Sequence, residues 1–186
     1  NAFQGISKLT IKGNIQYIPD ESFKNCASLS NIIIDANKIT GIGSSVFEGC
    51  ISLTEITIPS SVHSIGSNSF KDVKSLIING EIETIPSCSF KNCSSIMKIV
   101  LNTKTITSIQ SSAFEGCSSL IEITIPASIK TIESNAFLGI ETLTINSEIQ
   151  RIPNNSFKKC VSLTKIVLNT EKMDTIGSSA FEGCSS

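Results

Sequence analysis

Apolar residues recur along the chain in pairs that are separated by a single residue. This period of two is typical of a β-strand that buries one face. Pro or Asn follows most of the pairs, as at Pro59, Asn79 and Pro126, and both residue types favour the end of a strand. The pattern predicts short strands around these pairs: Leu9/Ile11, Ile32/Ile34, Ile56/Ile58, Leu76/Ile78, Ile99/Leu101, Ile123/Ile125, Leu143/Ile145 and Ile166/Leu168.

The phenylalanines share one register with these predicted strands. Their spacings along the chain repeat in the order 20, 24, 23, which gives the sequence a period of 67. The stretch FEGCISLTEITIP at Phe47–Pro59 accordingly returns at Phe114–Pro126 as FEGCSSLIEITIP. An Ile lies five residues before each Phe from the second onward, and a Cys or an aliphatic residue lies three residues after it. The nine positions are Phe3, Phe23, Phe47, Phe70, Phe90, Phe114, Phe137, Phe157 and Phe181.

Each unit of 20–24 residues therefore holds one strand, one short extended piece and one turn that carries Phe. A unit of this size cannot bury its own apolar residues, so neighbouring units must stack. Stacking places the strands about 4.8 Å apart in a parallel sheet, with a ladder of Phe behind it. We expect residues 1–186 to form a single mainly β solenoid of eight to nine coils, cut from a longer array because both ends fall inside the pattern.

Composition limits the possible partners. Hydrophobic residues make up 40% of the chain and charged residues 17%, which indicates a folded domain. The net charge of −1 gives no electrostatic case for nucleic acid. No apolar run approaches the ~18–20 residues that a membrane helix needs, so we expect no membrane insertion within this segment. No targeting signal is visible, which says nothing about where the parent protein resides.

The chain offers no recognisable catalytic set. His63 is the only histidine, and its repeat equivalents Glu83, Thr107 and Lys130 mark a solvent-exposed position. Without it no Ser-His-Asp or Cys-His arrangement can be drawn. The aspartates occupy unrelated positions in the coils, which argues against paired-carboxylate catalysis and a repeated calcium site. We predict a protein that is not an enzyme and that uses no metal and no cofactor.

Six of the seven cysteines lie three residues after a Phe, in neighbouring coils. Val73 and Ile140 fill the same position elsewhere, so we favour reduced cysteines in the core. Inter-coil disulfides are the alternative, whereas zinc is disfavoured because no CxxC motif or Cys/His cluster exists. Cys88 lies two residues before Phe90, where we expect it to be exposed and unpaired. The three pairs are Cys26/Cys50, Cys93/Cys117 and Cys160/Cys184.

The remaining candidate site is the outward face of the sheet. One column of this face holds Thr and β-branched residues, and the column beside it holds charged and polar residues. Such residues suit a solvated sheet without any ligand, but a repeat array also presents such a face to protein partners. We expect Ile33, Ile77, Val100 and Val167 to be exposed, which favours binding. The candidate ligand-binding residues are Asn31, Ile33, Glu55, Thr57, Ile77, Lys98, Val100, Glu122, Thr124, Lys165 and Val167.

The pattern I-x-x-x-x-F-x-x-C-x-x-L-x-x-I-x-I-P-x-x-[IV]-x-x-I, fullest over Ile42–Ile65 and Ile109–Ile132, resembles the BspA-like, or Treponema-type, leucine-rich repeat. The resemblance covers the whole chain, and the shortest units depart from it by losing the Cys and the L-x-x-I spacing. It implies a right-handed leucine-rich-repeat solenoid with one parallel sheet on the concave face. Short turns and 3-10 segments are implied on the convex side.

The resemblance also implies a function, because this family occurs in surface proteins of mucosal bacteria and protists, where several members are implicated in adhesion. It favours a non-catalytic protein-binding module of a cell-surface adhesin, which would engage host or extracellular-matrix proteins through the concave sheet. The alternative is a structural or intracellular scaffold repeat that spaces other domains. A monomer and an end-to-end stack through uncapped termini are both open.

Overall fold

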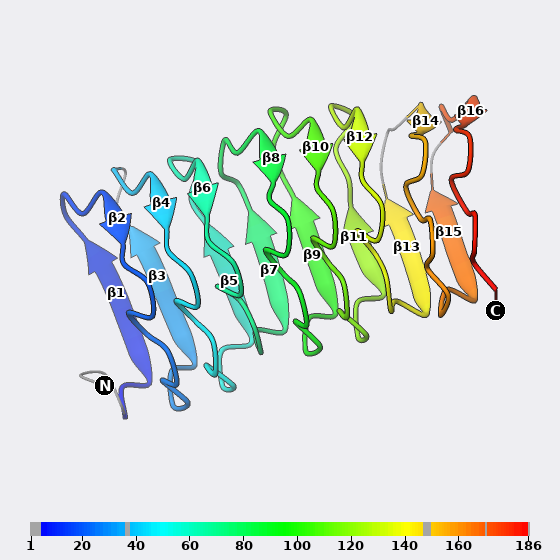
Figure 1. Cartoon of the computed structure of the whole chain (residues 1–186). Helices are drawn as coiled ribbons and strands as arrows, with labels where there is room; N and C mark the ends of the chain where they lie inside the picture. Colours follow the sequence, from blue (N-terminus) through cyan, green and yellow to red (C-terminus); the bar gives the residue numbers. More distant parts are fainter. Residues whose placement is uncertain (1–4, 36–37, 147–149, 170, 186) are drawn as a thin grey trace.

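The chain folds into a solenoid of stacked β-coils, each with one longer and one two-residue strand (Figure 1). The computed structural model describes residues 5–35, 38–146, 150–169 and 171–185. The longer strands are β1 (Lys8–Lys12), β3 (Asn31–Asp35), β5 (Glu55–Ile58), β7 (Ser75–Ile78), β9 (Lys98–Leu101), β11 (Glu122–Thr124), β13 (Thr142–Asn146) and β15 (Lys165–Asn169). The short strands are β2 (Tyr17–Ile18), β4 (Gly41–Ile42), β6 (Ser64–Ile65), β8 (Thr84–Ile85), β10 (Ser108–Ile109), β12 (Thr131–Ile132), β14 (Arg151–Ile152) and β16 (Thr175–Ile176).

The longer strands form the predicted parallel sheet, which confirms the mainly β solenoid. Strands β5, β7, β9, β11, β13 and β15 pair in sequence order, and β1 pairs with β3 in a separate two-stranded sheet. Rows of equivalent inward residues run across the strands: Ile56 pairs with Leu76, and Leu76 pairs with Ile99. The described residues show no ladder between β3 and β5, so the sheet is interrupted there.

A second irregularity lies between β11 and β13. The repeat would pair Ile123 with Leu143, but the structure pairs Ile123 with Ile145, a slip of two residues. Because side chains alternate between faces, a slip of two keeps the same set inward. Ile123 and Ile145 both remain buried. The slip therefore changes which residues are neighbours on both faces but keeps the apolar residues in the core.

The short strands form ladders of their own. Three sets are present in the described part of the chain: β2–β4–β6, β8–β10–β12 and β14–β16. The interruptions fall between Ile65 and Ile85 and again between Ile132 and Ile152, which are the shortest steps of the repeat. The period of the sequence is thus visible in the hydrogen bonding of the short strands.

The core is built around a stack of phenylalanine rings, which confirms the predicted Phe ladder. Consecutive rings from Phe23 to Phe181 lie with centroids 5.1–5.8 Å apart and interplanar angles of 7–27°. The rings from Phe47 to Phe157 are fully buried. Phe3, which the register also includes, lies outside the described residues.

Each Phe lies in a run of consecutive turns whose hydrogen bonds join residues three apart, as from Cys50 N to Phe47 O at 3.1 Å. The expected 3-10 segments are therefore replaced by turns in the described ranges. The residues two before and two after every described Phe have positive φ, such as Ser45 at 55° and Gly49 at 76° around Phe47. A left-handed residue cannot continue a right-handed helix, and this explains why no helix forms there.

Candidate functional site

The predicted ligand-binding residues all lie on the outward face of the longer strands, where they alternate with buried or half-buried residues. Those most open to solvent are Asn31, Ile33, Glu55, Thr57, Lys98 and Lys165, and those half-buried are Ile77, Val100, Glu122, Thr124 and Val167. Several of them share one row, because Thr57 pairs with Ile77, Ile77 with Val100, and Val100 with Thr124. Their role in binding stays a prediction.

The expected apolar stripe is smaller than predicted. Of its four members only Ile33 is exposed, at 52% of its surface. Ile77 and Val100 are half-buried because each lies between paired strands whose outward side chains cover it. Val167 is also half-buried, beside Thr144. The prediction of four exposed aliphatic residues was therefore wrong for three of them.

The two predicted columns are also not continuous over all coils. The interruption between β3 and β5 separates Ile33 from Thr57 in the outward row. The slip between β11 and β13 places Glu122 beside Thr144 rather than beside Thr142. The structure therefore joins the site residues of β5, β7, β9 and β11 in adjacent paired strands, places those of β3 across the interruption, and brings Lys165 and Val167 of β15 into one hollow with Glu122.

An ion pair crosses the continuous part of this face. Lys98 Nζ lies 2.9 Å from a carboxylate oxygen of Glu122 on the neighbouring strand. Just before these residues lie Met97 and Ile121, which are 48% and 56% exposed and are joined by a hydrogen bond from Ile121 N to Met97 O of 3.2 Å. Sequence reasoning missed both, although the repeat places polar Ser30 and Thr54 at the same position.

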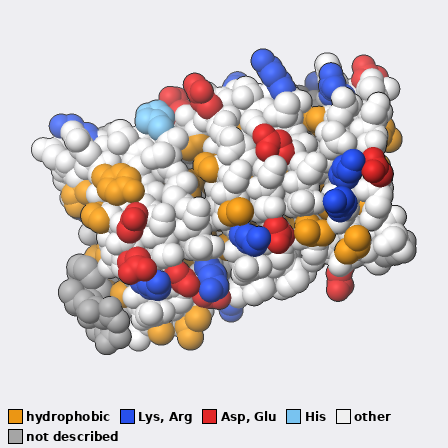
Figure 2. All heavy atoms as spheres, viewed as in Figure 1, with side chains coloured by type: hydrophobic (Ala, Val, Ile, Leu, Met, Phe, Trp, Pro, Cys, Tyr) orange, Lys and Arg blue, Asp and Glu red, His pale blue; other side chains and the backbone are white. Residues whose placement is uncertain are grey.

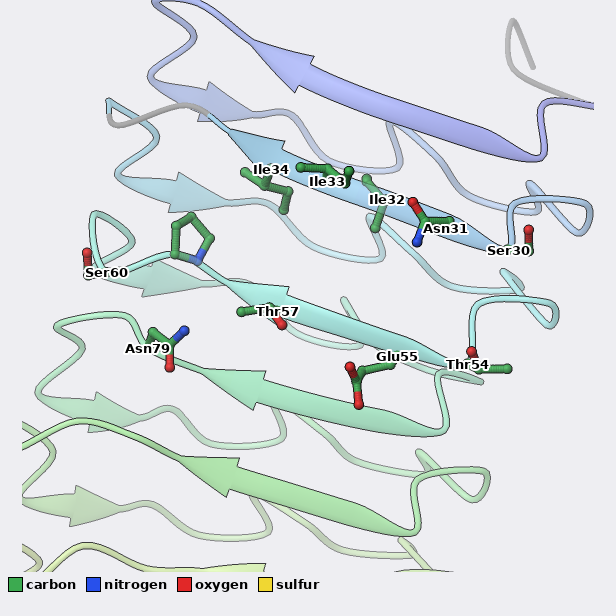
Figure 3. Close-up of a pocket in the computed structure, with 11 residues that line it drawn as sticks. Ser30, Asn31, Ile32, Ile33, Ile34, Thr54, Glu55, Thr57, Ser60 and Asn79 are labelled. Carbon is green, nitrogen blue, oxygen red and sulfur yellow. The ribbon is translucent and has the colours of Figure 1, made fainter.

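The interruption between β3 and β5 forms a groove of about 710 Å³ (Figure 3). Asn31 and Ile33 come from β3, and Glu55 and Thr57 come from β5. Four of the predicted binding residues therefore line one cavity. The opening also reaches toward the core, since Ile32 retains 8% exposure.

The side of the solenoid shown in Figure 2 carries oppositely charged side chains next to one another in several coils. The residue directly after Phe is Lys24, Glu48 and Lys71 in successive coils, and Glu48 lies 3.5 Å and 3.3 Å from the two lysines. Lys91 and Glu115 repeat this pair at 3.0 Å. Hydrogen bonds from Ser112 and then from Lys91 lower the pKa of Glu115. These contacts join neighbouring coils, and sequence reasoning did not identify them.

The cysteines behave as core residues. All seven are free, and those of the three pairs are buried, apart from half-buried Cys184. The second thiol of each pair donates to the carbonyl of a Phe in the preceding coil, as from Cys50 Sγ to Phe23 O at 3.2 Å. Burial raises the pKa of Cys50 to about 12. Cys88 is half-buried rather than exposed.

The described residues contain no group of His, Cys, Asp and Glu that could hold a metal ion. His63 is exposed, and its Nδ1 lies 3.3 Å from the carbonyl oxygen of Glu81. In the same described ranges, no helix is long and apolar enough to cross a membrane. What the described residues offer is thus a shallow sheet face that includes the groove between β3 and β5 and a smaller hollow over β11, β13 and β15.

Leucine-rich repeat proteins of bacteria are among the solved structures to which the chain is similar. A leucine-rich repeat protein from Eubacterium ventriosum is 26% identical with a TM-score of 0.65, and the match covers 97% of this chain but only 43% of that protein. The leucine-rich repeat protein of T. pallidum is 19% identical over 96% of this chain and 77% of its own, with a TM-score of 0.48. A leucine-rich cell surface protein from Faecalibacterium prausnitzii is 21% identical over 88% of this chain and 60% of its own, with a TM-score of 0.41.

None of the curated proteins matches the chain. The model of the family described as the BspA-type leucine-rich repeat region matches six copies, over residues 1–106 and 83–186. These two ranges together span the whole chain. The protein therefore belongs to the BspA-type leucine-rich repeat family.

Proposed function

We propose that the chain is a non-catalytic protein-binding module, and that it engages a host or extracellular-matrix protein through the concave sheet at a cell surface. The observation that carries this is the outward face of the longer strands, where exposed Ile33 lies among polar and charged side chains, and where exposed Met97 and Ile121 directly precede β9 and β11. Apolar side chains left in water on a sheet face favour a protein partner. The surface location rests on the resemblance of the repeats.

Binding is tested with a panel of purified collagen, laminin and fibronectin by surface plasmon resonance. The test variant Lys98→Glu/Val100→Asp/Lys165→Glu changes the charge and polarity of the concave face. The matched control Ile51→Asp/Lys104→Glu/Lys130→Glu makes comparable exchanges at exposed positions outside the longer strands. We expect the control to bind like wild type and the test variant to lose binding.

Equal binding by the test and control variants would show that the concave face is not the binding surface. If wild type binds none of the panel, these matrix proteins are excluded as partners. Circular dichroism and thermal unfolding of each variant show that the sheet is intact. The surface location is tested separately, by labelling intact cells of the source organism with an antibody against this chain. Labelling that requires permeabilised cells would favour the scaffold alternative.

A further inference from the structure

The groove between β3 and β5 has a matched counterpart in the same chain. The period of the sequence places Asn31 and Glu55 at the positions that Lys98 and Glu122 occupy on β9 and β11. At β9 and β11 the strands form a ladder, and Lys98 and Glu122 make an ion pair of 2.9 Å. At β3 and β5 an asparagine replaces the lysine, and no ladder joins the described strands. The chain thus contains a closed and an open form of one junction.

Glu55 is the charged side chain of the open junction. It is exposed, and the contact that the structure gives its carboxylate is a long one of 3.4 Å from Ser75 Oγ. The lining of the groove contains Glu55 and no lysine or arginine. Lys8 pairs in register with Asn31 on the far side of β3, away from β5. The lining of the groove therefore holds one carboxylate and exposed Ile33, without a lysine or arginine, and the Glu55 carboxylate leans toward Ser75 of β7 (Figure 3).

We propose that this groove binds an extended segment of a protein partner that presents a lysine or arginine to Glu55 and an aliphatic side chain to Ile33. The cation of the partner lies beside Glu55 as Lys98 lies beside Glu122. This correspondence is the reason for expecting a positively charged side chain in the partner. Ile33 lies two residues along the same face from Asn31, as expected for contacts with alternate side chains of an extended segment (Figure 3). The inference rests on the proposed function and assigns its partner's chemistry.

The test measures fluorescence anisotropy of a fluorescein-labelled peptide KVKVKV, with EVEVEV and KSKSKS as controls for charge and for the aliphatic side chains. The key variant is Asn31→Lys, which copies the closed junction. We expect it to weaken KVKVKV binding at least about tenfold, because an internal cation then occupies Glu55. Glu55→Gln should weaken binding similarly without adding a side chain. Lys130→Asn removes an exposed lysine outside the longer strands, and it should bind KVKVKV like wild type.

The proposal is overturned if wild type does not bind KVKVKV, if EVEVEV or KSKSKS binds equally well, or if Asn31→Lys and Glu55→Gln both bind like wild type. The matrix-protein panel separates this inference from the proposed function. If the panel binds through the concave face while the peptide result fails, the groove is wrong and the binding module stands. If neither the panel nor the peptide binds, the groove is wrong and these matrix proteins are removed as partners of the binding module.

Discussion

The residues on either side of each phenylalanine decide how its ring is presented to the core. Positive φ at the positions two before and two after Phe makes the chain turn sharply around the ring. The later position is often Gly, as in Gly49, Gly116 and Gly183, and otherwise includes Asn, which adopts this conformation more easily than most residues. The glycines of FEGC could be recognised as turn residues from the sequence, whereas the earlier position could not, because Glu, Ser, Asn and Cys all occur there.

Replacing Phe114 by Ala should destabilise the protein by about 3–5 kcal/mol. Its ring is fully buried and stacks on Phe90 at 5.1 Å and on Phe137 at 5.3 Å. Urea unfolding followed by circular dichroism measures the change in free energy. Phe181→Ala is the control, because that ring is only partly buried and stacks on one described neighbour. Equal losses for the two variants would contradict the Phe stack as the main cohesive element.

The cysteines should differ in reactivity toward iodoacetamide at about pH 8. Cys50 should stay unlabelled in the folded protein, since burial raises its pKa to about 12 and its thiol donates to Phe23 O. Cys88 should be labelled before Cys50, because it is half-buried, and before half-buried Cys184, whose thiol donates to Phe157 O. Peptide mass spectrometry after timed quenching gives the order. Labelling of Cys50 at the rate of Cys88 without unfolding would show that the core is more open than the structure indicates.

At the scale of the strands, stacking of coils depends on both the ladders and the side chains that cross between coils. The sequence predicted every longer strand from the period-2 pairs. It could not predict the interruption between β3 and β5 or the slip between β11 and β13, because the inward pattern is satisfied equally by a shift of two residues. The groove was missed for this reason. The sequence did carry one indication of it, because Asn31 occupies the position that Lys98 occupies one period later.

The ion pairs that follow Phe should make stability depend on pH. The folded pKa of Glu115 lies below its ordinary value of 4.5, first through the hydrogen bond from Ser112 and then through Lys91. Its stabilising contribution is therefore present above pH 4.5 and is lost as the pH falls through the lowered pKa. Urea midpoints measured from neutral to acidic pH should fall less steeply for Glu115→Gln than for wild type.

Lys91→Met provides the matched change on the other side of that pair. It removes the contact of 3.0 Å but keeps the hydrogen bond between Ser112 and Glu115. We expect the slope of stability against pH to lie between those of wild type and Glu115→Gln. A slope for Glu115→Gln as steep as that of wild type would show that this carboxylate does not contribute.

At the scale of the whole molecule, the repeat register predicted the solenoid, the parallel sheet and the stacked core. These features follow from the fixed positions at which apolar residues recur in each unit. A single unit cannot bury its apolar residues, whereas a stack of units can. The candidate site was predicted as positions on a face, but their exposure was not, because it depends on how neighbouring strands cover one another. Ile33 and Ile77 show this, since the same residue type at equivalent positions is exposed in one coil and half-buried in the next but one.

The seam between β3 and β5 also affects how the rod would respond to a pulling force. On the concave side no ladder joins the described strands there, while the stacked rings of Phe23 and Phe47 and the short ladder β2–β4–β6 continue across it. Tension on the two ends would therefore separate β3 from β5 on the concave side first, while the stacked rings of Phe23 and Phe47 stay in contact. A partner held in the groove would be bound at a junction that lacks the ladder of the longer strands, so its affinity would depend on the applied force.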